Sequence, residues 1–210
     1  MKLRKIAIEN YRGINERVEL LFNDFNCIVG KNDAGKSTIL KAVDAFLNDN
    51  APSQEDRNIY NASSIITIEL QFDVQGVEVT IDDAIPVSFV DEELVNGDGL
   101  LCVKKKWDVS MKTIKPKTFI VRKRYDENDF AMLPEKDLKK MCNNNGIAII
   151  DQNGNKGMRM QLRDAYKESN QTFSYVEEEL QTTGATRAKK IFDALKENFP
   201  VFEYFADFVC

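Results

Sequence analysis

Histidine is absent from the 210 residues of this chain. Imidazole is the base in Ser-His-Asp and Cys-His catalytic sites, and it is the commonest protein ligand of transition metals. Its absence therefore excludes these two catalytic classes and most transition-metal centres. Any nucleotide switch that depends on histidine would have to lie outside this chain.

The features that mark secreted and membrane proteins are also missing. The cysteines are far apart and form no C-x-x-C pair, which indicates free thiols in a reducing cytoplasm and argues against a metal site. No apolar run approaches the ~20 residues that a membrane helix needs, and the charged N-terminus has no apolar stretch of the signal-peptide kind. We therefore expect a cytoplasmic protein without membrane contacts. The cysteines are Cys27, Cys102, Cys142 and Cys210.

What the sequence does contain is a phosphate-binding loop, the octapeptide GKNDAGKS at residues 30–37. It has the form G-x-x-x-x-G-K-[ST], in which two glycines let the backbone bend into an anion-binding nest close to the phosphates. The ammonium group of Lys36 would meet the β- and γ-phosphates as the catalytic cation, and the hydroxyl of Ser37 would bind Mg²⁺. The predicted nucleotide contacts here are Gly30, Lys31, Asn32, Asp33, Ala34, Gly35, Lys36, Ser37 and Thr38.

The flanking sequence favours a working nucleotide site. Residues Phe25–Val29 form an apolar run of the strand type directly before the loop, and residues Thr38–Leu47 follow with apolar side chains at helical spacing on one face. Strand, loop and helix in this order are the context that the motif requires. No N-K-x-D motif for reading guanine is present, so we expect ATP, together with Mg²⁺, rather than GTP.

The chain changes character near residue 130, which predicts an α/β protein with two parts, 1–130 and 131–210. In the first part, alternating apolar residues predict strands, and Gly76 would turn the strand at 64–74 into a hairpin with 77–81. In the second, apolar residues at helical spacing predict a mainly helical segment. The predicted strands are 3–9, 17–22, 64–74, 77–81, 100–109 and 117–125, and the predicted helices are 135–142, 158–166 and 186–198.

Two stretches of the first part resemble a known family. They read KIAIENYRGINERVEL, which begins at Lys5, and NCIVGKNDAGKSTILKAVDAFLN, which begins at Asn26. The phrase N-[FY]-R-G-I at residues 10–14, followed by the loop with Asn32 inside it, is similar to the ABC-type ATPase domain of the OLD (overcoming lysogenization defect) nucleases and to related recombination and SMC-like ATPases. The resemblance is strong up to residue 50 and weaker after it.

This resemblance implies a P-loop NTPase of the ABC-type ATPase head kind, with antiparallel hairpins and, at 131–210, the start of a helical dimerisation insert. Two such heads would close around ATP, as a homodimer through the helical segment, in an enzyme of DNA processing or phage defence. The family's signature, Walker B and Toprim nuclease segments find no match here, so we expect an N-terminal piece or a truncated member. The alternative is a nucleotide-binding regulatory or interaction module that binds ATP without hydrolysing it.

Two single residues have two interpretations each. Arg12 would reach the γ-phosphate, or the nucleotide of a dimer partner, from the turn beside the loop; otherwise it is a surface arginine of that turn. Gln71 stands where a Mg²⁺-sensing glutamine could be sought. Its alternation with Leu70 and Phe72 instead favours the solvent face of a strand.

Asp91 and Glu92 imitate the acidic pair of a Walker B strand, in which they would hold Mg²⁺ and orient the attacking water. Pro86 begins the preceding apolar run and Ser88 interrupts it, and acidic residues continue at Glu93. A turn that leads into a short helix is therefore the favoured interpretation.

The segment Lys104–Arg124 holds nine lysines and arginines against Asp108 alone, in a chain whose net charge is −5. With Trp107 and Tyr125 interleaved, such a hairpin would follow the phosphate backbone of DNA. The alternative, which we favour, is a solvated hairpin whose lysines keep a sheet edge from aggregating.

Overall fold

The computed structural model describes residues 1–31, 35–82, 84–125, 129–149 and 154–203. The chain forms two compact units and passes from one to the other more than once. Unit 1 contains Met1–Asp73, Val103–Thr118 and the segment that begins at Phe199, and unit 2 contains Val74–Cys102 and Phe119–Asn198. Strands β6 (Leu101–Asp108) and β7 (Pro116–Tyr125) have residues in both units.

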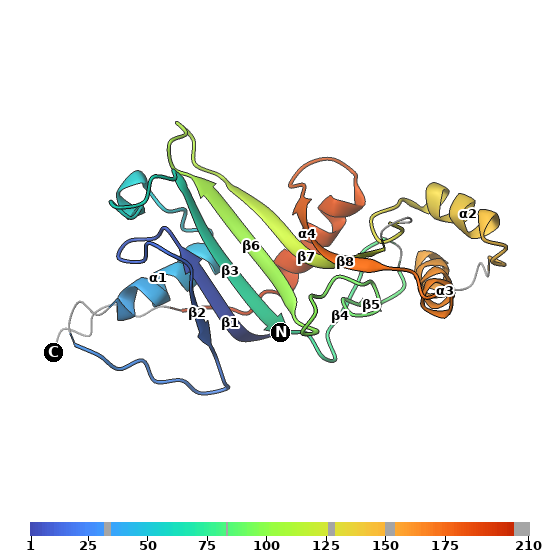
Figure 1. The fold of residues 1–210 in the computed structure, drawn as a ribbon, viewed down its shortest axis with the longest axis horizontal. Coiled ribbons are helices and arrows are strands. Elements are labelled where there is room, and N and C mark those ends of the chain that lie inside the picture. The colour runs from blue at the N-terminus through green and yellow to red at the C-terminus, as the bar shows by residue number, and fades with distance from the viewer. Residues whose placement is uncertain (32–34, 83, 126–128, 150–153, 204–210) are drawn as a thin grey trace. The chain divides into compact units, whose positions relative to one another are not determined.

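Four further strands complete a six-stranded sheet: β1 (Lys2–Glu9), β2 (Val18–Leu21), β3 (Ile65–Asp73) and β8 (Phe173–Leu180). The strand order is β2-β1-β3-β6-β7-β8 (Figure 1). In unit 1, β1 lies between β2 and β3 and is antiparallel to both, so that Ile6 faces Leu20 on one side and Leu70 on the other. The antiparallel pairing allows one face of the sheet to be apolar and the other charged.

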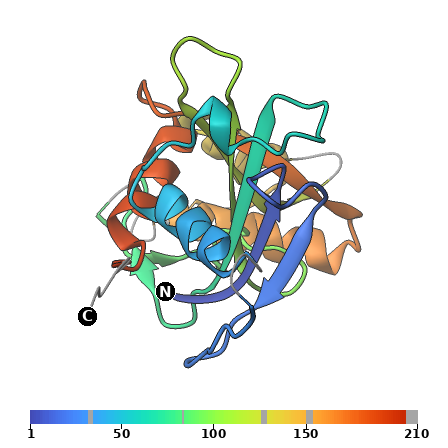
Figure 2. The same cartoon turned by 90° about the vertical axis from the view of Figure 1, so that its left-hand side faces the viewer.

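The apolar face of β3 forms the core of unit 1 together with the helix that follows the phosphate-binding loop. Every second residue of β3 is fully buried, as the period of two predicts for one face of a strand: Ile66, Ile68, Leu70 and Phe72. Helix α1 (Lys36–Leu47) lies across the sheet of unit 1 (Figure 2). Phe199 closes this core, since its ring centroid is 5.9 Å from that of Phe46 in α1 and 5.6 Å from that of Phe72 in β3.

Unit 2 combines helices with a small second sheet. Its short strands β4 (Glu78–Val79) and β5 (Val87–Ser88) pair antiparallel. Its helices are α2 (Glu135–Asn144), α3 (Gly154–Glu168) and α4 (Arg187–Asn198). One core cluster of this unit contains Tyr125, Phe130, Leu138, Cys142, Met158, Leu162 and Tyr166. None of the helices in the described part of the chain is long and apolar enough to cross a membrane.

The predicted strand at Phe25–Val29 is wrong: these residues form no strand, and Phe25 and Val29 are 87% and 83% exposed. A strand that is apolar on both faces is stable only between partner strands that bury it, and no described residue pairs with this segment. The predicted hairpin of 64–74 with 77–81 is also wrong. Strand β3 already has β1 and β6 as its neighbours, and β4 pairs with β5 instead.

The three predicted helices are confirmed, with small shifts at their ends. Strand β8 was not predicted, although the exposure of its side chains alternates from residue 175 to residue 180. The outward residues of this alternation are aromatic and acidic rather than uniformly polar: Phe173, Tyr175, Glu177 and Glu179. A pattern with aromatic residues on the exposed face does not have the clear contrast between faces on which sequence-based strand prediction depends.

Candidate nucleotide-binding site

The glycine before α1 has the backbone conformation that the phosphate-binding loop needs. Gly35 is the N-cap residue of α1, with φ 81° and ψ 8°, in the left-handed region that only glycine adopts without strain. Among the described residues no side-chain hydrogen bond caps the helix, and its first turn contains no acidic residue. The amide donors and the positive end of the helix dipole are therefore available to an anion. Three predicted contacts, Asn32, Asp33 and Ala34, lie outside the described residues.

Lys36 directs its ammonium group into the loop. Its Nζ donates hydrogen bonds to the carbonyl oxygens of Gly30, at 2.6 Å, and Lys31, at 2.5 Å. These contacts bring three of the predicted residues together and keep the cation beside the start of α1. Phosphate oxygens would compete for the same ammonium protons, and as charged acceptors they form stronger hydrogen bonds than carbonyls do. The donor set of the loop thus fits a nucleoside triphosphate.

A pocket of about 680 Å³ lies beside the first turn of α1. Thr38 of the helix contributes to it, as do the turn residues Arg12, Gly13 and Asn15 and the segment Glu55–Tyr60. All these residues belong to unit 1. The volume falls within the usual range of roughly 300–1,000 Å³ for small-molecule sites. Ile59 and Tyr60 present largely exposed side chains, 79% and 83%, that a planar ring could cover.

Arg12 is held at this pocket by several contacts. It stands in a left-handed turn with φ 53°, its Nη2 lies 2.8 Å from Oδ1 of Asp56, and its guanidinium carbon lies 5.5 Å from the centroid of the Tyr11 ring. Burial lowers the pKa of Arg12, but Tyr11 and Asp56 outweigh it and raise the pKa above its ordinary value. Arg12 is therefore a fixed positive charge rather than a loose surface side chain.

Asparagines fix the shape of the turn that carries Arg12, and sequence reasoning gave them no role. The side chain of Asn10, itself in a left-handed conformation with φ 56°, donates to the carbonyl oxygens of Ser63, at 2.9 Å, and Ile65, at 2.8 Å. Asn58 donates from Nδ2 to the carbonyl oxygen of Arg12 at 2.7 Å. The signal for Asn10 was present in the N-[FY]-R-G-I phrase; Asn58 has no sequence signal of this kind.

Comparison with known proteins identifies the family. Residues 1–207 match the model of the AAA ATPase domain. The chain belongs to this family. The match confirms the predicted fold class, an α/β P-loop NTPase fold, and with it the broader prediction of an ABC- or AAA-type ATPase.

A solved structure described as "Structural biochemistry of ATP-driven dimerization and DNA stimulated activation of SMC ATPases" is similar to this AAA ATPase domain at 12% identity. The similarity covers 70% of this chain and 81% of the other chain, with a TM-score of 0.41. No curated protein sequence matches the chain.

The other candidates of the AAA ATPase domain take part in local contacts. Gln71 lies on the face of β3 opposite Leu70, as predicted, but it is only 6% exposed rather than solvated. Its Nε2 donates to Oε1 of Glu69 at 2.8 Å, and Glu69 also pairs with Arg17 at 3.0 Å. The long side chains of Arg17 and of Lys104 in β6 reach Glu69, and such side chains can bury the residues beneath them, which period two alone does not predict.

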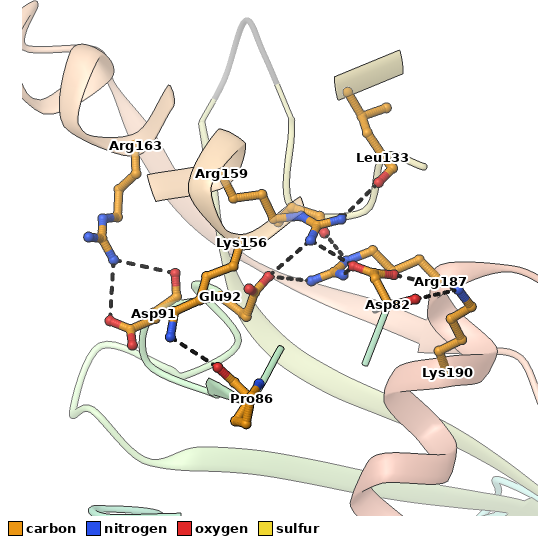
Figure 3. A network of polar contacts seen from close by, with 11 residues as sticks. Asp82, Pro86, Asp91, Glu92, Leu133, Lys156, Arg159, Arg163, Arg187 and Lys190 are labelled. Atoms are coloured by element: carbon orange, nitrogen blue, oxygen red, sulfur yellow. Dashed lines mark hydrogen bonds and ion pairs between the residues drawn. The ribbon is translucent and has the colours of Figure 1, made fainter. Parts of the chain in front are cut away.

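Asp91 and Glu92 stand in a turn, as favoured, but the expected short helix is wrong, since residues 94–100 form turns and bends but no helix. Both residues form ion pairs within unit 2 (Figure 3). Oδ1 of Asp91 lies 3.6 Å from Nη1 of Arg163. Glu92 is 2% exposed, and its Oε2 lies 2.5 Å from Nη2 of Arg187 and 3.4 Å from Nη1 of Arg159. Oε2 of Glu92 thus lies against two buried guanidinium groups, and these contacts give Glu92 a structural role.

Asp82 completes this buried network (Figure 3). Its Oδ2 lies 2.6 Å from Nη1 of Arg159 and also accepts a hydrogen bond from Arg187. Burial lowers the pKa of Arg187 to about 9, which still leaves the guanidinium charged at neutral pH. The network joins α3 and α4 to the segments that hold Asp82 and Glu92. It thereby fixes the irregular stretch between β3 and β6.

Most basic residues of the segment Lys104–Arg124 form ion pairs with acidic residues of the unit to which they themselves belong. In unit 1, Lys104 pairs with Glu69 at 3.5 Å. In unit 2, Nη2 of Arg122 lies 2.5 Å from Asp129 and 2.8 Å from Glu178. At the tip of the hairpin, by contrast, the side chains of Lys112 and Lys115 are exposed. These contacts agree with a hairpin whose charges are largely structural. Exposed cations remain at the tip and also on β7, where Lys117 and Arg124 are exposed.

Proposed function

We propose that this AAA ATPase domain binds Mg·ATP, with the phosphates on the Gly30–Ser37 loop and the nucleoside in the pocket between Arg12 and Thr38. The observation that carries the proposal is that the pocket lies next to the phosphate-binding loop. The pocket shares Thr38 with the first turn of α1, directly after the loop. A nucleotide held by the loop therefore has a cavity of suitable size beside its phosphates.

Each polar group has a role in this proposal. The ammonium of Lys36 leaves the carbonyl oxygens of Gly30 and Lys31 for the β- and γ-phosphates. The hydroxyl of Ser37 holds Mg²⁺, which neutralises phosphate charge when bound. Arg12 adds a second cation at the pocket, and its ion pair with Asp56 keeps the guanidinium in place before the nucleotide arrives.

On a larger scale, the proposal is an ATP-binding head of the OLD kind that closes on a second head around ATP, in DNA processing or phage defence. The N-[FY]-R-G-I phrase and the loop with Asn32 support it by resemblance. In this scheme residues 1–130 form the ATPase lobe, and 131–210 form the start of a dimerising segment. Sedimentation of the chain with and without Mg·ATP tests this: a shift from monomer to dimer with ATP is expected.

A second candidate function is a nucleotide-binding module that does not hydrolyse ATP. The ion pairs of Asp91 and Glu92 favour it, because they engage the acidic pair that most resembles a water-positioning pair. The two candidates share the nucleotide site and differ in turnover.

Calorimetric titration with Mg·ATP tests the shared proposal. The unmodified chain should bind, and Lys36→Ala should bind about tenfold or more weakly, because it loses a charged hydrogen bond to phosphate. Lys115→Ala, at the hairpin tip, is the matched control and should bind like the unmodified chain. Equal affinities for all three proteins, or no binding by any of them, would rule out the proposed site.

A further inference from the structure

Helix α1 obtains the cap of its C-terminal end from another element. Its last turn contains no basic residue, although the last carbonyl oxygens of a helix need donors and its negative dipole end favours a cation. The donor comes from β6. Nζ of Lys105 lies 2.7 Å from the carbonyl oxygen of Phe46, which is in the last turn of α1.

Lys105 is buried at this position: the residue is 5% exposed. Its Nζ lies 2.7 Å from Oδ1 of Asp49 and 4.9 Å from the centroid of the Phe46 ring. A buried ammonium group is costly unless it is paired and hydrogen-bonded, and these partners meet that need. Unlike its neighbours in the basic run, Lys105 therefore directs its charge at a helix end.

The residue that pairs with Lys105 is itself strained. Asp49 follows the C-cap residue Asn48 and has φ 54°, in the left-handed region that aspartate adopts at a cost. Glycine usually occupies this position after a helix. The side chain of Asp49 is 50% exposed, and its ion pair connects the residue after the helix to β6. The charge of Lys105 thus contacts both a carbonyl oxygen in the last turn of α1 and the residue that follows the helix.

We propose that Lys105 is a positioning residue for nucleotide binding, acting through α1. The proposal rests on the nucleotide site proposed above. The other end of this one helix carries Lys36, Ser37 and the amide donors of the first turn. A helix of 12 residues is a rigid element of about 18 Å, so fixing its C-terminal end limits the tilt and fraying that would move the donors at its N-terminal end. ATP then finds the donors already in place and binds more tightly.

This role can be separated from a purely structural one. Replacing a buried ion pair by an apolar side chain of similar volume is often neutral for stability. Lys105→Met keeps most of the volume beside Val103 and Trp107 and removes the charge, whereas Lys105→Arg keeps the charge and donors. A second variant that tests the role is Asp49→Gly. It removes the carboxylate that pairs with Lys105, relieves the left-handed strain and leaves the core unchanged.

The experiment is calorimetric titration of the full chain with Mg·ATP, with the folded fraction of each variant measured by circular dichroism. Lys105→Met should weaken ATP binding by about three- to tenfold, the size expected for a partly buried cation at a helix end. Lys105→Arg should restore most of the affinity. Amide hydrogen exchange of residues 36–40 should be faster in Lys105→Met than in the unmodified chain, and unchanged in the other variants. Lys115→Met, on the exposed tip of the same hairpin, is the control.

An unchanged ATP affinity in a folded Lys105→Met variant would overturn the positioning role. If that variant does not fold, Asp49→Gly decides: weaker ATP binding supports the role, and unchanged binding overturns it. Failure of the proposed nucleotide site has a different signature, since the unmodified chain and Lys36→Ala would then give the same absence of ATP binding.

Discussion

Arg187 and Glu92 meet in the interior of unit 2, with Nη2 of the arginine 2.5 Å from Oε2 of the carboxylate and each side chain 2% exposed. Glu92→Ala should therefore destabilise the protein by about 3–5 kcal/mol, because the buried guanidinium groups of Arg159 and Arg187 would then share the single negative charge of Asp82. Urea unfolding measures this. The control is Asp91→Ala, whose pair with Arg163 at 3.6 Å involves a carboxylate that is 40% exposed and should cost less than about 1 kcal/mol. Equal losses in the two variants would contradict the structural role of the buried network.

Glu69 should make the stability of the protein depend on acid pH. Burial raises its pKa, but the hydrogen bonds from Arg17 and Gln71 and the charges of Arg17 and Lys104 outweigh burial and hold the pKa below the ordinary 4.5. A carboxyl group whose pKa is lower in the folded state stabilises the protein above its unfolded pKa, and this contribution is lost as the pH falls through the folded pKa.

The measurement is the free energy of unfolding as a function of pH from neutral down to the acid transition. Below pH 4.5 the unmodified chain should lose stability more steeply than Glu69→Gln, which has already lost the ionised group. Glu16→Gln, at an exposed position, serves as control and should follow the unmodified chain. Parallel curves for all three proteins would mean that the charge of Glu69 contributes nothing.

Gly35→Ala should damage the loop through its backbone alone. Apart from the adjacent residues of the chain, no atom of the described residues lies within 4 Å of an added Cβ, but φ is +81°, so the cost is the left-handed strain of about 1–2 kcal/mol. Thermal unfolding and ATP titration are both needed. Gly76→Ala carries the same kind of strain at φ +72° with the same open space, but outside the loop. Both variants should therefore lose stability, and only Gly35→Ala should also lose ATP affinity; a similar loss of affinity in Gly76→Ala would point to a general effect of destabilisation.

Turnover of ATP by the isolated chain should be far below the enzyme median of ~10 s⁻¹. Phosphoryl transfer depends on groups that position the attacking water, and the acidic pair at 91–92 is engaged with arginines. Release of inorganic phosphate with saturating Mg·ATP is the measurement, with Lys36→Ala as the background control. A turnover near the median that disappears in Glu92→Gln would return this glutamate to a catalytic role.

If the chain contacts DNA, the contact should come from the tip of the basic hairpin. Lys112 and Lys115 are exposed there, whereas Lys104 and Arg122 form ion pairs with Glu69 and with Asp129 and Glu178. Retention of duplex DNA in a low-salt gel shift should fall steeply with added salt and show little dependence on sequence. Changing both tip lysines to Gln should abolish it, and changing Lys136 and Lys140, exposed on α2, should not. No retention at low salt would leave the hairpin a solvated structural element.

The parts of the fold that were predictable are those that local sequence determines. The loop, α1 and the buried alternation of β3 depend on residues within one segment, and so their patterns are visible in one sequence. The run Phe25–Val29 is equally apolar, but an apolar strand needs neighbours that no local pattern supplies.

The candidate site divides in the same way. Lys36, Ser37 and Arg12 belong to contiguous motifs, whereas Asn58 and Asp56 reach Arg12 only because the chain folds back. Lys105 was hidden for another reason. It is the middle one of three consecutive lysines, so the sequence around it does not distinguish it from the other two. Only the period of two along β6 directs its side chain toward the core.

Phe199 has a consequence for how the protein is made. Its ring completes the core of unit 1 against Phe46 and Phe72, residues that are synthesised much earlier. Unit 1 also takes Val103–Thr118 from the middle of the chain. The ribosome must therefore release the chain as far as Phe199 before this unit can close, and contacts of such long sequence separation form slowly. During that interval the apolar surface of α1 and β3 that Phe199 later covers is exposed. Exposed apolar surface of this kind promotes aggregation, which chaperones prevent.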